Sequence, residues 1–229
     1  MLFVSGMAHN TGHEHADELS FELFEFGERI IVDSGKYGYE KDEFRKYVRS
    51  VRAHNTVSLL DQHLGPADTR LTGSALSPVT TSEGTFVIPG EIERGDALRH
   101  QRELAYRPRE FLLITDRVRS GEQPFAVLFH VSHTLNVTRE ESAFIIHLSD
   151  GGRARLEMLE GSCTGTLIEG QRVPHVQGWE SIGYLQMTPA PTVRFDCAPG
   201  DRMVQTLISF GAEARTEALR IARQRQQAS

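Results

Sequence analysis

Short runs of alternating apolar and polar residues recur along most of the chain and are separated by turn-forming residues. Among them are "LSFELFEF", "ERIIVDSG", "REFLLITDRV", "PFAVLFHVS" and "MVQTLISF". Alternation places every second side chain on one face of a strand, and many short strands at regular spacing are typical of a sandwich. We therefore predict an all-β fold, an antiparallel β-sandwich, in one domain that spans residues 1–229.

Turn signals between neighbouring runs predict two hairpins. "EFGERI" indicates a turn at Gly27 and Glu28, which would bring Asp33 near Glu22 on the opposite strand. "PREFLLITDRVRSGEQPFAVLFHVS" indicates a second hairpin that turns at residues 120–124. Both hairpins would place sequence neighbours side by side in one sheet.

Two stretches depart from the strand pattern. "EKDEFRKYVRSVR" places apolar residues at helical spacing, which predicts a short helix or ordered loop around residues 41–50. The tail after Gly211 contains helix formers and no further glycine, so it is either a terminal helix or a frayed end.

The composition excludes some classes of protein. A net charge of −6 argues against a general affinity for nucleic acid or anionic membranes, and no apolar run approaches the roughly 18 residues that span a bilayer. The first residues lack a basic leader, so we expect no signal peptide. The chain is then cytoplasmic, or a segment of an exported protein of the periplasm or cell envelope. Cys163 and Cys197 leave the redox compartment open.

The polar start of the first long run is the main candidate for chemistry. In a strand, His13, His15 and Asp17 would share a face with the apolar residues that follow. Buried imidazole and carboxylate groups need partners, which a metal ion or a hydrogen-bonded cleft would supply. The alternative is a solvated strand entrance whose histidines face water.

Two further segments favour a metal site. Asp33 ends one predicted strand and His54 opens another. Two imidazoles and one carboxylate suit a first-row divalent ion such as zinc, with His15, Asp33 and His54 as ligands. The register of the first hairpin keeps Asp33 away from His15 unless residues 13–18 fold back as a loop, so we expect such a loop.

Basic and aromatic residues near these segments suit an acidic sugar. On one helix, Arg45, Arg49 and Arg52 would line one face and bind carboxylate or sulfate groups. The alternative is a solvated face that pairs with the acidic residues of segment 40–43. Trp179 and Tyr184 would either stack on a sugar ring or belong to the core.

The segments "GHEHADELSFELFEFGERIIVDSGKYGYE" and "FRKYVRSVRAHNTV" together resemble the C-terminal β domain of heparinase II/III-like polysaccharide lyases. "ELAYRPREFLLITDRV" and "GWESIGY" resemble later, weaker signatures of the same domain. The resemblance implies a supersandwich-like β domain that normally follows a helical toroid domain. It also implies β-elimination on acidic glycans such as heparin-like chains or alginate.

The resemblance further assigns roles to residues. His15, Asp33 and His54 match zinc ligands of several family members, and His13 matches a histidine that faces the substrate cleft. Tyr37, Tyr39 and Tyr47 lie where the family contributes a tyrosine, so we take His13, Tyr39 and Tyr47 as catalytic candidates. Other catalytic groups of the family come from the toroid, which we expect this chain to lack, so catalysis would require a separate toroid domain or chain.

Three functions fit these observations. The chain is the β-sandwich part of a lyase that acts on an acidic polysaccharide or oligosaccharide, with zinc bracing the loops of the cleft. Alternatively, it is a non-catalytic carbohydrate-binding or structural module that keeps the metal site. A third interpretation is a metal-dependent enzyme in which the same three ligands activate water.

Overall fold

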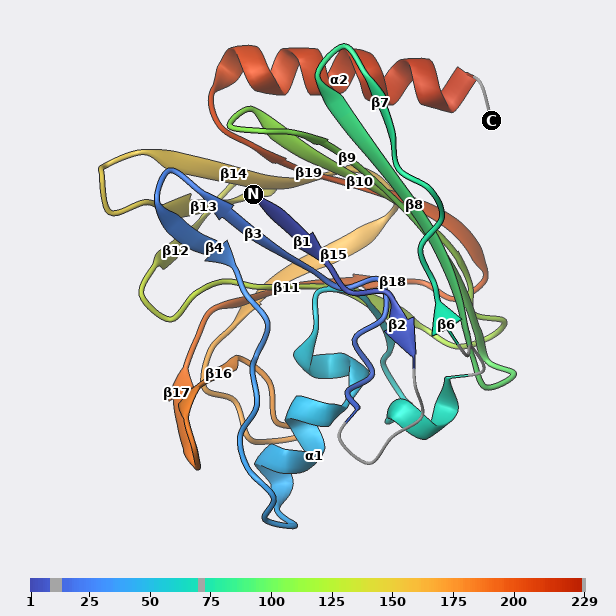
Figure 1. The fold of residues 1–229 in the computed structure, drawn as a ribbon, viewed down its shortest axis with the longest axis vertical. Helices are drawn as coiled ribbons and strands as arrows, with labels where there is room; N and C mark the ends of the chain where they lie inside the picture. The colour runs from blue at the N-terminus through green and yellow to red at the C-terminus, as the bar shows by residue number, and fades with distance from the viewer. Residues whose placement is uncertain (9–13, 70–72, 228–229) are drawn as a thin grey trace.

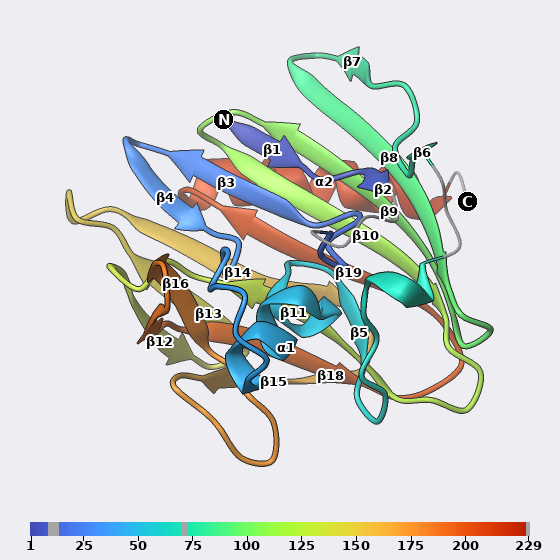
Figure 2. The same ribbon diagram turned by 60° about the horizontal axis from the view of Figure 1, so that its bottom comes forward.

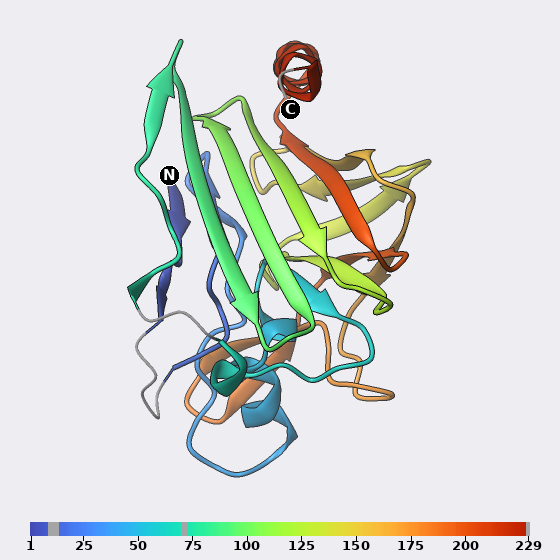
Figure 3. The same ribbon diagram turned by 90° about the vertical axis from the view of Figure 1, so that its right-hand side faces the viewer.

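The structure is a computed structural model that describes residues 1–8, 14–69 and 73–227, and its elements form four layers (Figures 1 and 3). Helix α2 (Ala212–Gln227) covers the outer face of a large β-sheet. The inner face of that sheet packs on two smaller sheets, and helix α1 (Glu43–Arg49) lies beyond them (Figure 2). The predicted antiparallel β-sandwich is confirmed.

The large sheet has eight antiparallel strands in the order β12-β13-β14-β19-β10-β9-β8-β7. Its strands are β7 (Thr80–Ser82), β8 (Thr85–Arg94), β9 (Leu98–Arg107), β10 (Phe111–Arg119), β12 (Asn136–Glu140), β13 (Ala143–His147), β14 (Arg153–Glu160) and β19 (Asp201–Ser209).

The facing layer consists of a four-stranded sheet in the order β15-β18-β11-β5 and a three-stranded sheet in the order β1-β3-β4. An isolated bridge between Ile31 and Val131, with the backbone hydrogen bonds beside it, joins the two. Their strands are β1 (Leu2–Val4), β3 (Phe21–Glu25), β4 (Glu28–Ile31), β5 (Val57–Leu59), β11 (Phe125–His130), β15 (Cys163–Ile168) and β18 (Thr192–Cys197).

Smaller elements decorate the edges of these layers. They are the pair β2 (Met7–Ala8) and β6 (Gly73–Ser74), the hairpin β16 (Trp179–Gly183) and β17 (Gln186–Pro189), and the 3-10 helices η1 (Val51–Ala53) and η2 (Pro66–Asp68). In the described part of the chain, no helix is both long and apolar enough to cross a membrane.

The core between the two layers is rich in phenylalanine. Phe129 contacts Phe21 and Phe195 edge-on, at centroid distances of 6.2 Å and 6.1 Å, and Phe195 contacts Phe144 at 5.8 Å. Each buried aromatic ring contributes roughly 1.5–3 kcal/mol through loss of contact with water. The core therefore fixes the sheets from which the polar loops emerge.

The first predicted hairpin is confirmed, with its turn one residue earlier than predicted. β3 and β4 pair with Leu23 opposite Ile31, and the turn residues Phe26 and Gly27 both have positive φ, 54° and 83°. Gly27 adopts this conformation without steric cost. Residues 14–20 precede β3 as a loop, which is the fold-back that a meeting of His15 and Asp33 requires.

The second predicted hairpin is wrong. β10 lies in the eight-stranded sheet and β11 in the four-stranded sheet, so the connection of residues 120–124 crosses between layers. β10 pairs instead with β9 and β19, and β11 pairs with β5 and β18. Alternation and a turn signal do not specify which strand is the partner, because both sheets offer an apolar face.

The two predicted helical segments are both helical. Asp42 caps the N-terminus of α1, because its Oδ1 accepts a hydrogen bond of 2.9 Å from the backbone N–H of Arg45. α2 packs Ala218 and Ala222 against Phe111, Leu113 and Leu207 of the large sheet. A disulfide bond joins Cys163 of β15 to Cys197 of β18, which are direct partners in that strand pair.

Candidate metal centre

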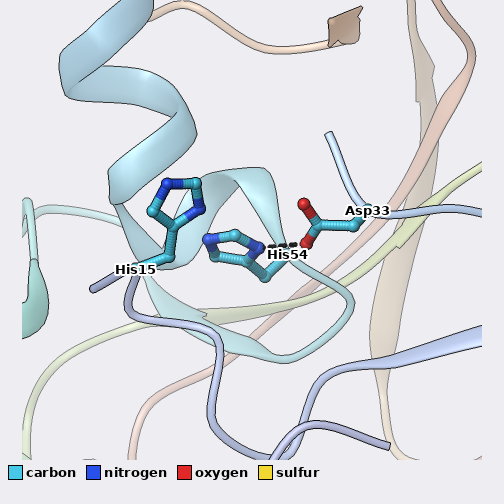
Figure 4. A group of neighbouring side chains, drawn as sticks. All are labelled: His15, Asp33 and His54. Atoms are coloured by element: carbon cyan, nitrogen blue, oxygen red, sulfur yellow. Dashed lines mark hydrogen bonds and ion pairs between the residues drawn. The ribbon is translucent and has the colours of Figure 1, made fainter. Parts of the chain in front are cut away.

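Three loops bring His15, Asp33 and His54 together at the α1 side of the sandwich. His15 precedes β3, Asp33 follows β4, and His54 lies between η1 and β5. One potential ligand atom of each side chain lies within 4.8 Å of the other two. His54 lies between the other two residues (Figure 4), with its Nδ1 at 2.5 Å from Asp33 Oδ2 and its ring centroid 5.5 Å from that of His15.

The residue after His54 ties the surrounding strands together. The buried side chain of Asn55 donates from Nδ2 to the carbonyl oxygens of Phe21 and Val32, at 2.7 Å and 2.8 Å. Its Oδ1 accepts from the backbone N–H of His130 at 2.6 Å. Asn55 thereby connects β3, the end of β4 and β11, and this fixes the backbone beside both His54 and Asp33.

Two buried arginines of the large sheet hold the loop that carries His15. Arg94 of β8 binds the carboxylate of Glu18 at 2.5 Å and the carbonyl of Ala16 at 3.3 Å. Arg102 of β9 donates to the carbonyl of Leu19 at 2.9 Å. Both arginines are almost fully buried, so hydrogen bonds to the loop satisfy guanidinium groups that water does not reach.

Arg102 is itself anchored by a buried acidic partner. Asp116 of β10 accepts from Arg102 Nε and Nη2, at 2.7 Å and 3.0 Å, and lies 2.7 Å from Nε2 of His100. Sequence reasoning missed Arg94, Arg102 and Asp116 as supports of the site. The available signal was that charged residues occur at apolar-face positions of otherwise well-patterned strands.

The electrostatics of the cluster favour one charged carboxylate and one neutral imidazole. Burial, together with the neighbouring His54, lowers the pKa of His15 to about 4. Burial alone would raise the pKa of Asp33, but His54 and the backbone N–H of Gly35 outweigh it and lower this pKa to about 2. Burial opposes the charged form of His54, yet Asp33 raises its pKa overall.

The donor set also fits a metal ion. The Nε2 atom of His54 is buried and has no hydrogen-bond partner among the described residues, although buried imidazole nitrogens are normally paired. A neutral imidazole nitrogen that no protein group occupies can bind a metal ion. Two histidines and an aspartate suit zinc.

The catalytic candidates differ in position. His13 lies outside the described residues. Tyr39 is 50% exposed, and its hydroxyl oxygen lies 2.8 Å from Nζ of Lys36, which lowers the pKa of Tyr39 by hydrogen bonding and charge. Tyr47 is only 2% exposed, shares a 3.0 Å hydrogen bond with Ser34, and has a pKa raised by burial.

The three predicted substrate-binding arginines do not share one helical face, which corrects that expectation. α1 ends at Arg49, and Arg52 belongs to η1. Each guanidinium donates to a backbone carbonyl of a different loop: Arg45 to Gly38, Arg49 to Glu14 at 3.2 Å and Arg52 to Leu60 at 2.7 Å. Because Glu14 adjoins His15, Arg49 helps to position the His15 loop.

The two aromatic candidates, Trp179 and Tyr184, lie in different environments. Trp179 packs edge-on against Phe44 at 5.1 Å and donates from Nε1 to the carbonyl of Gln171, so it belongs to the cluster under α1. Tyr184 is 62% exposed at the tip of the β16–β17 hairpin. The sequence alone left both interpretations open for each residue.

Comparison with known proteins identifies the family. The chain matches the model of the family described as "Heparinase II/III-like, C-terminal" over residues 2–192, and it belongs to this family. The predicted resemblance is therefore confirmed. No curated protein sequence matches the chain.

Solved structures show the same fold. Heparan sulfate lyase HepC from Pedobacter heparinus superposes with a TM-score of 0.75 at 18% identity, covering 92% of this chain and 33% of that one. A heparinase III, the BT4657 gene product, gives a TM-score of 0.74 at 20% identity, covering 91% and 32%. The chain thus spans about a third of these proteins and has the fold of a heparinase-like C-terminal β-sandwich domain.

Proposed function

We propose that this domain supplies part of the active site of a lyase that cleaves uronate-containing glycans by β-elimination. The observation that carries the proposal is the convergence of His15, Asp33 and His54 from three separate segments of a heparinase II/III-like domain. The similar structures are named as a heparan sulfate lyase and a heparinase. An acidic glycosaminoglycan is therefore the first substrate class to test, with alginate second.

In this proposal the cluster holds a zinc ion that braces the loops. His15, Asp33 and His54 would be its ligands, because one potential ligand atom of each lies within 4.8 Å of the other two. When bound, the ion would contribute structural stability. β-Elimination needs no activated water, so the proposal requires no open metal position.

The reaction requires three contributions from protein groups. One neutralises the carboxylate of the uronate, one removes the C5 proton, and one protonates the leaving glycosidic oxygen. His13 directly precedes the braced segment and would act on the carboxylate or the C5 proton. Tyr39 would exchange protons with the substrate, because its phenol is exposed and Lys36 makes the phenolate easier to form.

The remaining candidates would contribute less directly. The burial of Tyr47 supports a positioning role beneath α1, since its hydroxyl bonds Ser34 next to Asp33. Arg45 lies with its guanidinium 5.2 Å from the ring of Tyr39, so of the three arginines it is best placed to bind an acidic group near that tyrosine. Arg49 and Arg52 would stabilise loops. The other catalytic groups would come from a helical toroid domain.

The proposal is tested by following formation of the unsaturated uronate product in the ultraviolet. The chain is incubated with heparan sulfate and with alginate, alone and together with a toroid domain of the family. Tyr39→Phe is compared with Tyr184→Phe, which removes the hydroxyl of another exposed tyrosine. We expect product only with the toroid present. Under that condition Tyr39→Phe should lose at least about a hundred-fold in rate, and Tyr184→Phe should keep the rate of the unaltered chain.

Two outcomes separate the alternatives. Glycan binding without any product, with the toroid present, would show a non-catalytic carbohydrate-binding module. Equal activity of Tyr39→Phe and the unaltered chain would remove Tyr39 from the mechanism and leave His13 as the principal candidate.

A further inference from the structure

A cavity lies at the other end of the molecule from the candidate metal centre, where α2 begins. It has a volume of about 750 Å³, within the range of small-molecule sites. Its lining comes from the β3–β4 turn, from β13, β14 and the turn between them, and from the junction of β19 with α2. α1 and α2 lie on opposite sides of the sandwich (Figure 1), so this cavity is separate from the candidate metal centre.

One part of the cavity wall is apolar. Phe26 and Phe210 contact each other edge-on at a centroid distance of 5.0 Å, and Ile145 and Leu148 complete this part of the lining. Phe26 occupies the turn position with φ of 54°, where asparagine or glycine is more usual. A large aromatic side chain at this position supplies a wall that those residues could not.

The other part of the lining contains an unpaired buried hydroxyl. Ser209 is 1% exposed, and its Oγ has no hydrogen-bond partner among the described residues. It lies two residues after Leu207, which packs under α2, so its side chain is on that outer face of the sheet. A buried hydroxyl without a partner is uncommon, and a ligand oxygen would satisfy it.

The charges around this hydroxyl favour an anion. Arg153, Arg155 and Arg215 line the cavity together with the acidic residue Asp150, and Arg153 also lies 3.7 Å from Glu140. The buried carboxylate of Glu157 orients two of these arginines, at 2.5 Å from Arg215 Nε and 3.3 Å from Arg155 Nε. Gly211 and Ala212 also line the cavity, so the positive end of the α2 dipole adds to the arginines.

We propose that this cavity binds a small organic carboxylate with an apolar body. The carboxylate would lie at Ser209, Arg155 and the first turn of α2, and the apolar part would contact Phe26 and Phe210. A ligand must match both parts of the lining. A purely apolar ligand would leave the hydroxyl unpaired, and an inorganic anion would leave the aromatic wall exposed to water. The site goes beyond the proposed lyase function and does not depend on it.

The test measures binding of octanoate, with octanol as the uncharged probe of equal chain length. Each is titrated against the full chain in competition with the fluorescent sulfonate 8-anilinonaphthalene-1-sulfonate. The key variant is Ala212→Glu, which places a negative charge at the cavity mouth while favouring the helix N-terminus, so folding should be preserved. Gln224→Glu adds the same charge about three turns further along α2 and is the matched control.

We expect octanoate to displace the dye at least about ten-fold more effectively than octanol does. Ala212→Glu should weaken octanoate about ten-fold or more, whereas Gln224→Glu should change it less than about two-fold. The proposal is overturned if octanol competes as well as octanoate. It is also overturned if Ala212→Glu, with an unchanged melting temperature, binds octanoate as the unaltered chain does.

Discussion

Among the described residues, two histidine–aspartate pairs have opposite characters. His100 and Asp116 lie 2.7 Å apart in the large sheet, and both are 1% exposed. His54 and Asp33 lie 2.5 Å apart between loops, and Asp33 remains 27% exposed. The same two residue types therefore occur once inside a sheet and once at the edge of the molecule.

The difference lies in what completes each pair. Arg102 takes both carboxylate oxygens of Asp116, so that the carboxylate is saturated by protein groups. Beside Asp33, by contrast, Nε2 of His54 has no partner in the part of the chain that the structure describes, and a second imidazole, His15, lies close by. A histidine–aspartate pair thus indicates a binding site only when the surrounding protein leaves one of its atoms without a partner.

The largest expected effect is on stability and distinguishes the two carboxylates. Asp116→Asn should lower the free energy of unfolding by about 3–5 kcal/mol, because it leaves the buried guanidinium of Arg102 without a charged partner. Asp33→Asn in metal-free protein should cost only about 1 kcal/mol, since the Asp33 side chain is 27% exposed and an amide can still accept a hydrogen bond. Urea unfolding of both variants measures this. Equal losses would contradict the division between a structural pair and a site.

Removal of metal should act on the His54–Asp33 pair and leave the His100–Asp116 pair unaffected. If the cluster binds zinc, chelation should lower the stability of the unaltered chain by about 2.7 kcal/mol relative to zinc at a hundred times its Kd, or roughly 5–11 °C in Tm. His15→Ala should abolish this dependence, whereas His147→Ala, at the C-terminal end of β13 and outside the cluster, should keep it. Calorimetry with and without chelator, combined with metal analysis, provides the measurement. Unchanged melting and metal content in the unaltered chain would disprove the metal site.

The smallest expected effect is the dependence of the free energy of unfolding on pH below about pH 4. Burial opposes ionisation of Asp116, but Arg102 and His100 outweigh it and hold its pKa below the ordinary 3.8. The folded form therefore releases the proton more readily than the unfolded form, and the stabilisation present above pH 3.8 decreases as the pH falls below it. The slope for one proton is at most about 1.4 kcal/mol per pH unit.

Comparison with Asp116→Asn isolates this contribution. The variant cannot titrate at position 116, so its free energy of unfolding should fall less steeply between pH 4 and pH 2 than that of the unaltered chain. Denaturant unfolding at a series of pH values gives both slopes. Parallel curves would assign the acid dependence to other carboxylates.

Local pattern determined several elements correctly. The alternation of residues around Gly27 predicted the β3–β4 hairpin, and the spacing of apolar residues after Asp42 predicted α1. The family motif named His15, Asp33 and His54, which lie together in the structure, although their metal binding stays a prediction. These features depend on residues close in sequence, or on a motif that already records their arrangement.

Tertiary structure alone decided the rest. The connection after β10 crosses to the other sheet, because strand partners are chosen by packing over the whole domain and alternation reports only which face is buried. Arg94 and Arg102 support the His15 loop from strands that lie 76 and 83 residues further along the chain than the groups they bind. Whether a charged residue is a support, a ligand or an exposed group depends on such distant partners, which no local periodicity encodes.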